Sequence, residues 1–321
     1  MHRTLIFNQF GRPTEVLKFG QAEETVLKNE EVLVKMCYVP INPSDILPIT
    51  GTYAHRTILP SIPGYEGMGI IVRVGNHISK TRIGQRVLPL RGDGLWQEYV
   101  KCDADFAVLV PETINDIAAS QLYINPLTAW VLCKEILKVQ KGQIVAINAA
   151  NSAFGRIIIQ LSKILDFHVL ATVRKENHIN ELRSLGAVEV IKCDDEELLL
   201  KLKNWNIDAA IDLVGGILGT CLAQSVKSGG LFQTIGLLSG KQVDWKRISS
   251  FPIKSGLFHL RYWNEKQTVE TWQNRLNEVI NLVSNNQLKL NTNFKIFNYE
   301  EAQEGLKLYE KGKNGKIIIK F

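Results

Sequence analysis

The sequence has few cysteines and none of the spacings that build cysteine-rich sites. Its five cysteines are scattered over 321 residues, at Cys37, Cys102, Cys133, Cys193 and Cys221. Disulfide scaffolds and zinc knuckles need closely spaced pairs such as CxxC. We therefore predict reduced thiols and expect neither a disulfide framework nor a structural zinc site.

Long apolar runs and blocks of like charge are also missing. No stretch approaches the roughly 18 apolar residues of a membrane-spanning helix, and the pattern of Met1–Gly11 predicts a strand rather than a targeting segment. Lys and Arg are spread along the chain, with a net charge of +6, which disfavours nucleic-acid binding but suits anionic ligands. We expect a soluble cytoplasmic protein that binds neither membranes nor nucleic acids.

The chain is longer than one compact core usually supports, so a domain boundary is expected. Residues 1–124 contain short alternating runs separated by Gly, Pro and Asn, which predicts a mostly-β domain with irregular loops. In residues 125–262, short apolar strands alternate with helical stretches, which predicts a doubly wound parallel α/β sheet. Residues 263–321 are expected to return to the first domain through a terminal strand, Lys316–Lys320.

The full glycine fingerprint of a dinucleotide-binding turn is absent after the first strand of this sheet, Ile144–Asn148. The turn reads Ala149-Ala150-Asn151-Ser152-Ala153-Phe154-Gly155, and only Gly155 matches the fingerprint. The other small residues still allow a pyrophosphate to approach the N–H groups at the helix start. We assign cofactor contacts to Asn151, Ser152, Ala153, Phe154 and Gly155. An ordinary strand-to-helix turn is the alternative.

A carboxylate is missing where an NAD-binding domain would carry one. The second strand, His168–Val173, is followed by Arg174 and Lys175, whereas an NAD site places Asp or Glu there to bind the ribose 2′-hydroxyl. Two cations suit the 2′-phosphate of NADP instead. This pattern predicts NADPH as the cofactor, with a solvated basic loop as the alternative.

Several short motifs together resemble the medium-chain dehydrogenase/reductase superfamily. They are Ile41–Ile46, Gly51–Tyr53, Pro63–Gly69, Asn125–Ala129, Ala150–Gly155 and Asp212–Gly216. In order and spacing they resemble the quinone oxidoreductase and trans-2-enoyl thioester reductase branches over nearly the whole chain. The resemblance implies a GroES-like, mostly-β catalytic domain joined to a Rossmann NADP-binding domain.

The zinc alcohol dehydrogenases of that superfamily have two metal ligands that this chain lacks. Asn42 stands where they carry a Cys ligand, and Tyr65 stands where they carry a His ligand. A catalytic zinc needs three protein ligands around an open position. The resemblance therefore implies a zinc-independent enzyme with no metal ligands.

The enoyl thioester reductases look closest, and the resemblance implies roles for individual residues. Tyr53 and Asn42 become the catalytic candidates, as a phenol and an amide that stabilise charge on the substrate carbonyl oxygen. The remaining cofactor positions are Asn125, Thr128, Gly236 and Phe258, the last within a cofactor-flanking strand expected in Phe251–Trp263. The implied reaction is NADPH-dependent reduction of the double bond of a trans-2-enoyl thioester, carried by CoA or by acyl carrier protein.

Several alternatives remain open at this stage. An NADPH:quinone oxidoreductase differs only in its acceptor, and a non-catalytic NADPH-binding protein would keep the same fold. Tyr53 can also be a packed loop tyrosine, and the Asn42–Asp45 segment can be plain turn chemistry. For Glu66, a buried structural carboxylate held by backbone donors is favoured over a role in orienting the site. The family forms homodimers through sheet edges, and Leu231–Leu238 is the apolar stretch that we predict for that contact.

Overall fold

The structure is a computed structural model that describes residues 1–23, 26–92, 94–192, 197–290, 293–312 and 315–321. The chain forms two compact units. Unit 1 comprises 1–124, 269–284 and 290–321, and unit 2 comprises 125–268 and 285–289. The sequence analysis placed the boundaries after residues 124 and 262.

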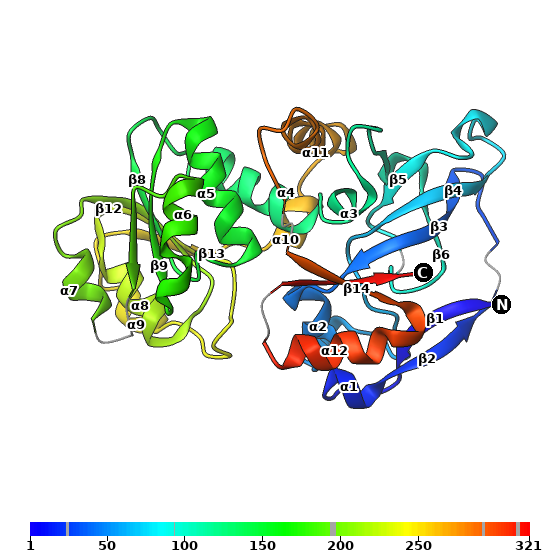
Figure 1. Cartoon of the computed structure of the whole chain (residues 1–321), viewed down its shortest axis with the longest axis horizontal. Coiled ribbons are helices and arrows are strands. Elements are labelled where there is room, and N and C mark those ends of the chain that lie inside the picture. Colours follow the sequence, from blue (N-terminus) through cyan, green and yellow to red (C-terminus); the bar gives the residue numbers. More distant parts are fainter. Residues whose placement is uncertain (24–25, 93, 193–196, 291–292, 313–314) are drawn as a thin grey trace. The chain divides into compact units, whose positions relative to one another are not determined.

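Unit 2 is built on a six-stranded parallel sheet in the order β10-β9-β8-β11-β12-β13. Strands β8, β9, β12 and β13 are labelled in Figure 1. Its strands are β8 Ile144–Ile147, β9 His168–Val173, β10 Glu189–Lys192, β11 Ile207–Asp212, β12 Val226–Thr234 and β13 Lys254–Leu257. From β8 the chain runs outward through β9 to β10, and it then crosses back to β11. The carboxyl ends of β8 and β11 therefore mark the topological switch point, where open α/β sheets bind ligands. The doubly wound sheet predicted from the sequence is confirmed.

Helices connect these strands and cover the sheet. They are α4 Ile124–Val131 continuing as a π-helical turn Leu132–Ile136, α5 Ala153–Leu165, α6 Ile179–Leu185, α7 Leu198–Leu202, α8 Gly216–Gln224, α9 Trp245–Ile248 and α10 Leu260–Glu265. In α5, Ile158 and Leu161 are fully buried, because apolar residues three positions apart share one helix face. Helix α6 packs beside α5, while α8 lies beside α7 and α9 (Figure 1).

Two sequence predictions about unit 2 are wrong. Strand β12 begins and ends earlier than the predicted Leu231–Leu237, and it lies between β11 and β13. The stretch Leu231–Leu238 therefore does not form a sheet edge; β13 does. The segment Phe251–Trp263 is not one strand either, since β13 ends at Leu257 and His259 accepts the Arg261 N–H at the start of α10.

Unit 1 contains a seven-stranded sheet in the order β14-β15-β3-β4-β5-β7, with β6 also paired to β3. The strands are β3 Glu31–Pro40, β4 Met68–Val74, β5 Arg86–Pro89, β6 Tyr99–Asp103, β7 Ala107–Leu109, β14 Phe294–Asn298 and β15 Lys316–Lys320, and a separate hairpin joins β1 His2–Phe7 to β2 Leu17–Ala22. Met36, Ile71 and Trp96 are among its buried core residues. Strand β15 pairs antiparallel with β3, which brings the end of the chain beside residues 38–40. The GroES-like architecture is confirmed in outline.

Unit 1 also contains several helices. They are α1 Pro13–Val16, α2 Pro43–Ile49, α3 Asp116–Ala119, α11 Val269–Ser284 and α12 Ala302–Glu310. Helix α2 lies within the segment predicted as mostly β; it begins at Pro43, which suits the first helical turn, and the Asp45 carboxylate accepts the Asn42 N–H before it. Helix α12 lies against β14 and β15 (Figure 1).

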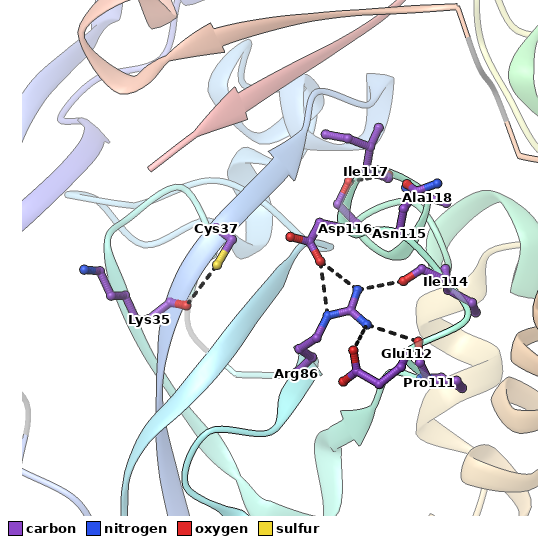
Figure 2. Close-up of polar contacts among 11 residues, drawn as sticks. Lys35, Cys37, Arg86, Pro111, Glu112, Ile114, Asn115, Asp116, Ile117 and Ala118 are labelled. Atoms are coloured by element: carbon purple, nitrogen blue, oxygen red, sulfur yellow. Dashed lines mark hydrogen bonds and ion pairs between the residues drawn. The ribbon is translucent and has the colours of Figure 1, made fainter.

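The segment that leads from unit 1 toward α4 is anchored at its start by Arg86 of β5. The Arg86 guanidinium donates to the Pro111 and Ile114 carbonyls at 3.1 and 2.7 Å and to the Asp116 carboxylate at 2.7 Å (Figure 2). Its side chain is only 15% exposed. Hydrogen bonds from a charged guanidinium are stronger than hydrogen bonds between neutral groups. Arg86 therefore holds in place the loop before α3, which is part of the segment that leads to Ile124.

The structure can be compared with the predictions of reduced cysteines and of no membrane-spanning helix. Cys37, Cys102, Cys133 and Cys221 are free thiols, and Cys193 lies outside the described residues. Cys37 contacts the Lys35 carbonyl at 3.9 Å (Figure 2), and burial raises the pKa of its thiol. No helix in the described part of the chain has both the length and the apolar character needed to cross a membrane.

Candidate active site

Asn42 stands at the start of α2, where its backbone and side chain have separate roles. Its backbone N–H donates to Asp45 Oδ2 at 2.8 Å, and the other Asp45 oxygen accepts the Tyr65 N–H at 3.0 Å. Asp45 therefore binds two loops by backbone contacts. The Asn42 side-chain amide is not used in these backbone contacts and can bond to other residues of the site. Asn42 is only 2% exposed.

Glu66 is the partner of that amide. Asn42 Nδ2 donates to Glu66 Oε1 at 2.8 Å, while Glu66 Oε2 accepts the Tyr123 and Ile124 N–H groups at 3.2 and 2.7 Å. Glu66 is 1% exposed. As predicted, it is a buried carboxylate held by backbone donors. It also orients Asn42, so the two roles that the sequence analysis set against each other occur together.

Lys316 completes the cluster, and the sequence analysis did not assign it a role. Its ammonium donates to Asn42 Oδ1 and lies 4.0 Å from Glu66 Oε1. The residue is 7% exposed, which is rare for lysine unless it is paired. The only sequence signal was its place at the start of the predicted terminal strand. Nothing in that local pattern indicated a partner 274 positions away.

Burial dominates the electrostatics of this cluster. It raises the pKa of Asp45 to about 7 against the hydrogen bond from the Asn42 N–H, and the nearby Glu66 charge adds to the rise. It also raises the pKa of Glu66, which the Lys316 charge and three hydrogen bonds oppose. Burial lowers the pKa of Lys316, while both carboxylates oppose that shift. Perturbed groups of this kind gather at functional sites.

Tyr53 lies in unit 1 on the loop between α2 and the 3₁₀ turn Ala54–Arg56. It is half-buried, and its carbonyl accepts the Thr57 hydroxyl at 2.9 Å and the Arg56 N–H at 3.0 Å. The Arg56 guanidinium lies 3.8 Å from the centre of the Tyr53 ring. This cation–π stack and the carbonyl contacts give Tyr53 a defined place on the loop.

In unit 2, the predicted cofactor turn lies at the carboxyl end of β8. Ser152 caps α5, accepting the Gly155 N–H at 3.1 Å, and the Arg156 side chain donates to the Asn151 carbonyl and pairs with Glu181. A Cβ on Gly155 would lie 2.4 Å from the Ala150 carbonyl oxygen, so only glycine fits. Arg156, which the sequence analysis passed over, thus holds the turn from outside.

A second buried network supports the same edge of the sheet. Asp212, at the end of β11, accepts the Asn148 amide at 2.5 Å, the Thr234 hydroxyl at 3.0 Å and the Gly215 N–H at 3.0 Å. Asn148 in turn accepts the Leu213 N–H at 2.7 Å. These contacts join the carboxyl ends of β8, β11 and β12 at the switch point. They were not predicted, because each residue belongs to a different strand.

The other predicted cofactor residues of unit 2 fall into two groups. Arg174 and Lys175 directly follow β9 and are exposed, and Phe258 directly follows β13 and is buried. Gly236 lies beyond the end of β12, against Leu213, where a Cβ would lie 2.6 Å from the Leu213 carbonyl oxygen. These residues therefore share the carboxyl edge of the sheet with the cofactor turn. Asn125 and Thr128 lie apart from it in sequence, half-buried on α4.

These features fit a dinucleotide cofactor. The Ala150 backbone excludes a side chain at position 155, so the start of α5 packs closely on the turn after β8. Helix α5 presents its N-terminus there, as anion-binding helices do. Two cations follow the neighbouring strand β9. Among the described residues, no three His, Cys, Asp or Glu side chains gather as metal ligands would.

The sequence is similar to a known domain family and to named enzymes. Residues 28–112 match the alcohol dehydrogenase GroES-like domain. The mitochondrial enoyl-[acyl-carrier-protein] reductase of Xenopus tropicalis is 34% identical, with 75% of this chain and 71% of that protein covered. The protein of the same name from Caenorhabditis elegans is 32% identical, with 75% and 72% covered.

A solved structure is closer in sequence. A candidate NADPH:quinone reductase from Bacillus thuringiensis is 42% identical, with a TM-score of 0.95 over 100% of this chain and 99% of that one. The relatives thus agree on the fold and on oxidoreductase chemistry. Their names divide between two kinds of electron acceptor.

Proposed function

Because the chain belongs to the medium-chain dehydrogenase/reductase family, we propose that it reduces the carbon–carbon double bond of trans-2-enoyl thioesters with NADPH. The observation that carries this proposal is the buried Asn42–Glu66–Lys316 cluster, which presents an oriented amide instead of a metal ligand. The enoyl reductase names of the relatives support the substrate class.

NADPH supplies hydride when it is bound. In this proposal, the backbone N–H groups of Ala153 and Phe154 in the first turn of α5 hold its pyrophosphate, and Arg174 and Lys175 bind its 2′-phosphate by charge-assisted bonds. Asn125, Thr128, Gly236 and Phe258 line the remainder of the cofactor site. The place of this turn at the carboxyl end of β8, at the switch point of the sheet, supports this assignment.

Conjugate reduction adds hydride to the β-carbon and a proton to the α-carbon of the thioester. Negative charge builds on the carbonyl oxygen between these two events, so the site must stabilise an enolate. We assign that task to the Asn42 amide N–H and the Tyr53 hydroxyl, with Tyr53 also acting as the proton donor. Both groups are neutral donors, and neither role needs zinc.

Tyr53→Phe tests this mechanism. The change removes one hydroxyl and keeps the ring that stacks on Arg56. We expect kcat for a trans-2-enoyl-CoA to fall by about 10²-fold or more, the usual size of a general acid–base contribution, while NADPH affinity stays constant. Tyr38→Phe, on strand β3, is the matched control. An unchanged kcat in Tyr53→Phe would remove that hydroxyl from the mechanism.

Quinone reduction is the second candidate, favoured by the name of the 42% identical Bacillus protein. Purified protein should be given NADPH with a trans-2-enoyl-CoA and, separately, with a simple quinone, and NADPH oxidation followed by absorbance. We expect the higher kcat/KM with the thioester. Preference for the quinone would move the chain to the second candidate. Cofactor binding without turnover of either would favour a non-catalytic NADPH-binding protein.

Two further proposals concern assembly and location. We propose a homodimer joined through β13, one of the two edge strands of the unit 2 sheet, in place of the predicted Leu231–Leu238 contact. The cytoplasmic location remains a prediction from the sequence, since both enoyl reductase relatives are named as mitochondrial proteins. Fractionation of the source cells with a tagged chain would decide between these compartments.

A further inference from the structure

The Asn42 amide is held at both ends by groups of opposite charge. Its nitrogen donates to the Glu66 carboxylate at 2.8 Å, and its oxygen accepts from the Lys316 ammonium. All three side chains are at least nine-tenths buried. An asparagine amide has nearly the same shape when turned by 180°, so packing alone cannot fix which end is which.

The two charges remove that ambiguity. A turned amide would point its NH₂ group at the ammonium and its carbonyl at the carboxylate, and both contacts would be repulsive. In a buried site such an arrangement costs far more than in water, because the surroundings screen charge weakly. Glu66 is itself held by the Tyr123 and Ile124 N–H groups, so it cannot readily follow a turned amide.

We propose that Lys316 is a positioning residue, which fixes the orientation of the Asn42 amide and so aims its second N–H at the substrate. The amide nitrogen has two hydrogens, and the bond to Glu66 uses one of them. The role of the second as a donor to the enolate rests on the proposed function. The orientation itself follows from the contacts of the amide with Lys316 and Glu66, and it is tested separately.

Lys316→Met tests the kinetic consequence. The substitution keeps the approximate length of the side chain and removes its charge and donors. We expect kcat for the enoyl thioester to fall by about tenfold or more while the KM for NADPH changes less than about threefold. Lys320→Met, at the exposed end of the same strand, is the matched control and should behave like wild type. An unchanged kcat in Lys316→Met would overturn the proposal.

A double variant separates positioning from simple charge balance. Lys316→Met with Glu66→Gln removes one charge of each sign, so it restores activity if Lys316 only neutralises Glu66. Positioning predicts the opposite result. The new side chain in Glu66→Gln would offer an NH₂ group to the Asn42 amide, which would then turn, and kcat would stay low. Recovery of wild-type kcat in the double variant would overturn the proposal.

Nuclear magnetic resonance of the folded wild-type protein tests the orientation without any activity assay. We expect the side-chain ¹³Cγ and ¹⁵Nδ2 signals of Asn42 to change as Lys316 loses its proton, at a pH below the usual lysine value, because burial lowers the pKa of Lys316. Glu66 and Asp45 are the charged groups that face it. Asn42 signals that ignore the protonation of Lys316 would overturn the proposal, even if Lys316→Met failed to fold. A wild-type protein that shows this response but reduces neither acceptor would instead refute the proposed function.

Discussion

At the scale of single residues, Arg174 decides the choice of cofactor in this account. It is exposed directly after β9, where a 2′-phosphate would meet its guanidinium and gain a charge-assisted, bidentate contact. We expect Arg174→Ala to raise the KM for NADPH by about tenfold or more and to leave the KM for NADH nearly constant. Steady-state kinetics with both cofactors measures this. Equal effects on both would show that Arg174 is only a solvated surface residue.

Asp45 makes the stability of unit 1 depend on pH. Burial raises its pKa in the folded protein to about 7, above the ordinary 3.8. A carboxyl group with a raised folded pKa stabilises the fold when protonated, so its contribution is complete below about pH 4 and is lost as the pH rises toward 7. Relative to Asp45→Asn, wild type should therefore lose roughly 2 kcal/mol of unfolding free energy between about pH 5 and pH 8. Denaturant titrations at both pH values measure it, and a constant difference would contradict the raised pKa.

The residues of the site differ in how far the sequence revealed them. Asn42 and Glu66 lie in short local motifs, so a single sequence was enough to propose them. Lys316 was invisible, because its partners are set by the register of β15 on β3 and not by its neighbours. Asp212 was found only as part of a motif, since its partners Asn148 and Thr234 lie on other strands. Long-range polar contacts of this kind leave no periodic pattern.

At the scale of elements, Gly155 tests the turn between β8 and α5. A Cβ there would lie 2.4 Å from the Ala150 carbonyl oxygen, which is backbone and cannot move freely. We expect Gly155→Ala to destabilise unit 2 by roughly 1–3 kcal/mol, as overpacking does, and to weaken NADPH binding. Gly256→Ala is the control, because its Cβ would meet only the movable Gln233 side chain. Thermal unfolding measures the stability and cofactor titration measures the affinity for NADPH. If Gly155→Ala changed neither, the turn would be able to hold a Cβ at this position.

Apolar strands with clear ends were the easiest to predict. Strands β9 and β15 begin and end at the predicted residues. Helix α12 was missed, partly because Gly305 interrupts it and glycine disfavours helices. That glycine lets α12 pack closely on the sheet, since a Cβ there would lie 3.1 Å from the Ile317 side chain and 3.2 Å from the Phe297 ring. Tertiary packing overrides local propensity at such positions.

At the scale of the whole molecule, the division into two units could be anticipated from the change of rhythm near Asn125. The return of residues 285–289 to unit 2 could not, because five residues between a helix and a strand carry no signal of their own. The apolar stretch predicted for a sheet edge, Leu231–Leu238, was also misplaced, since β12 lies between β11 and β13. An apolar stretch shows that a strand is buried, but not whether its neighbour belongs to the same chain.

The proposed dimer gives a prediction at this scale. The Phe258 N–H donates to Thr234 in β12, so by alternation the Leu257 N–H points away from the sheet at the β13 edge. Leu257 is also 64% exposed. We expect wild type to sediment as a dimer and Leu257→Pro as a monomer, because proline removes that N–H. A monomeric wild type would refute the assembly without affecting the proposed chemistry.

The most direct test of the central claim follows one hydrogen. Purified protein should be incubated with NADPH deuterated at the reactive C4 position and a trans-2-enoyl-CoA, and the acyl product analysed by mass spectrometry. The account predicts a saturated acyl-CoA with a single deuterium on the β-carbon. Unchanged enoyl-CoA under conditions in which a quinone is reduced would contradict it.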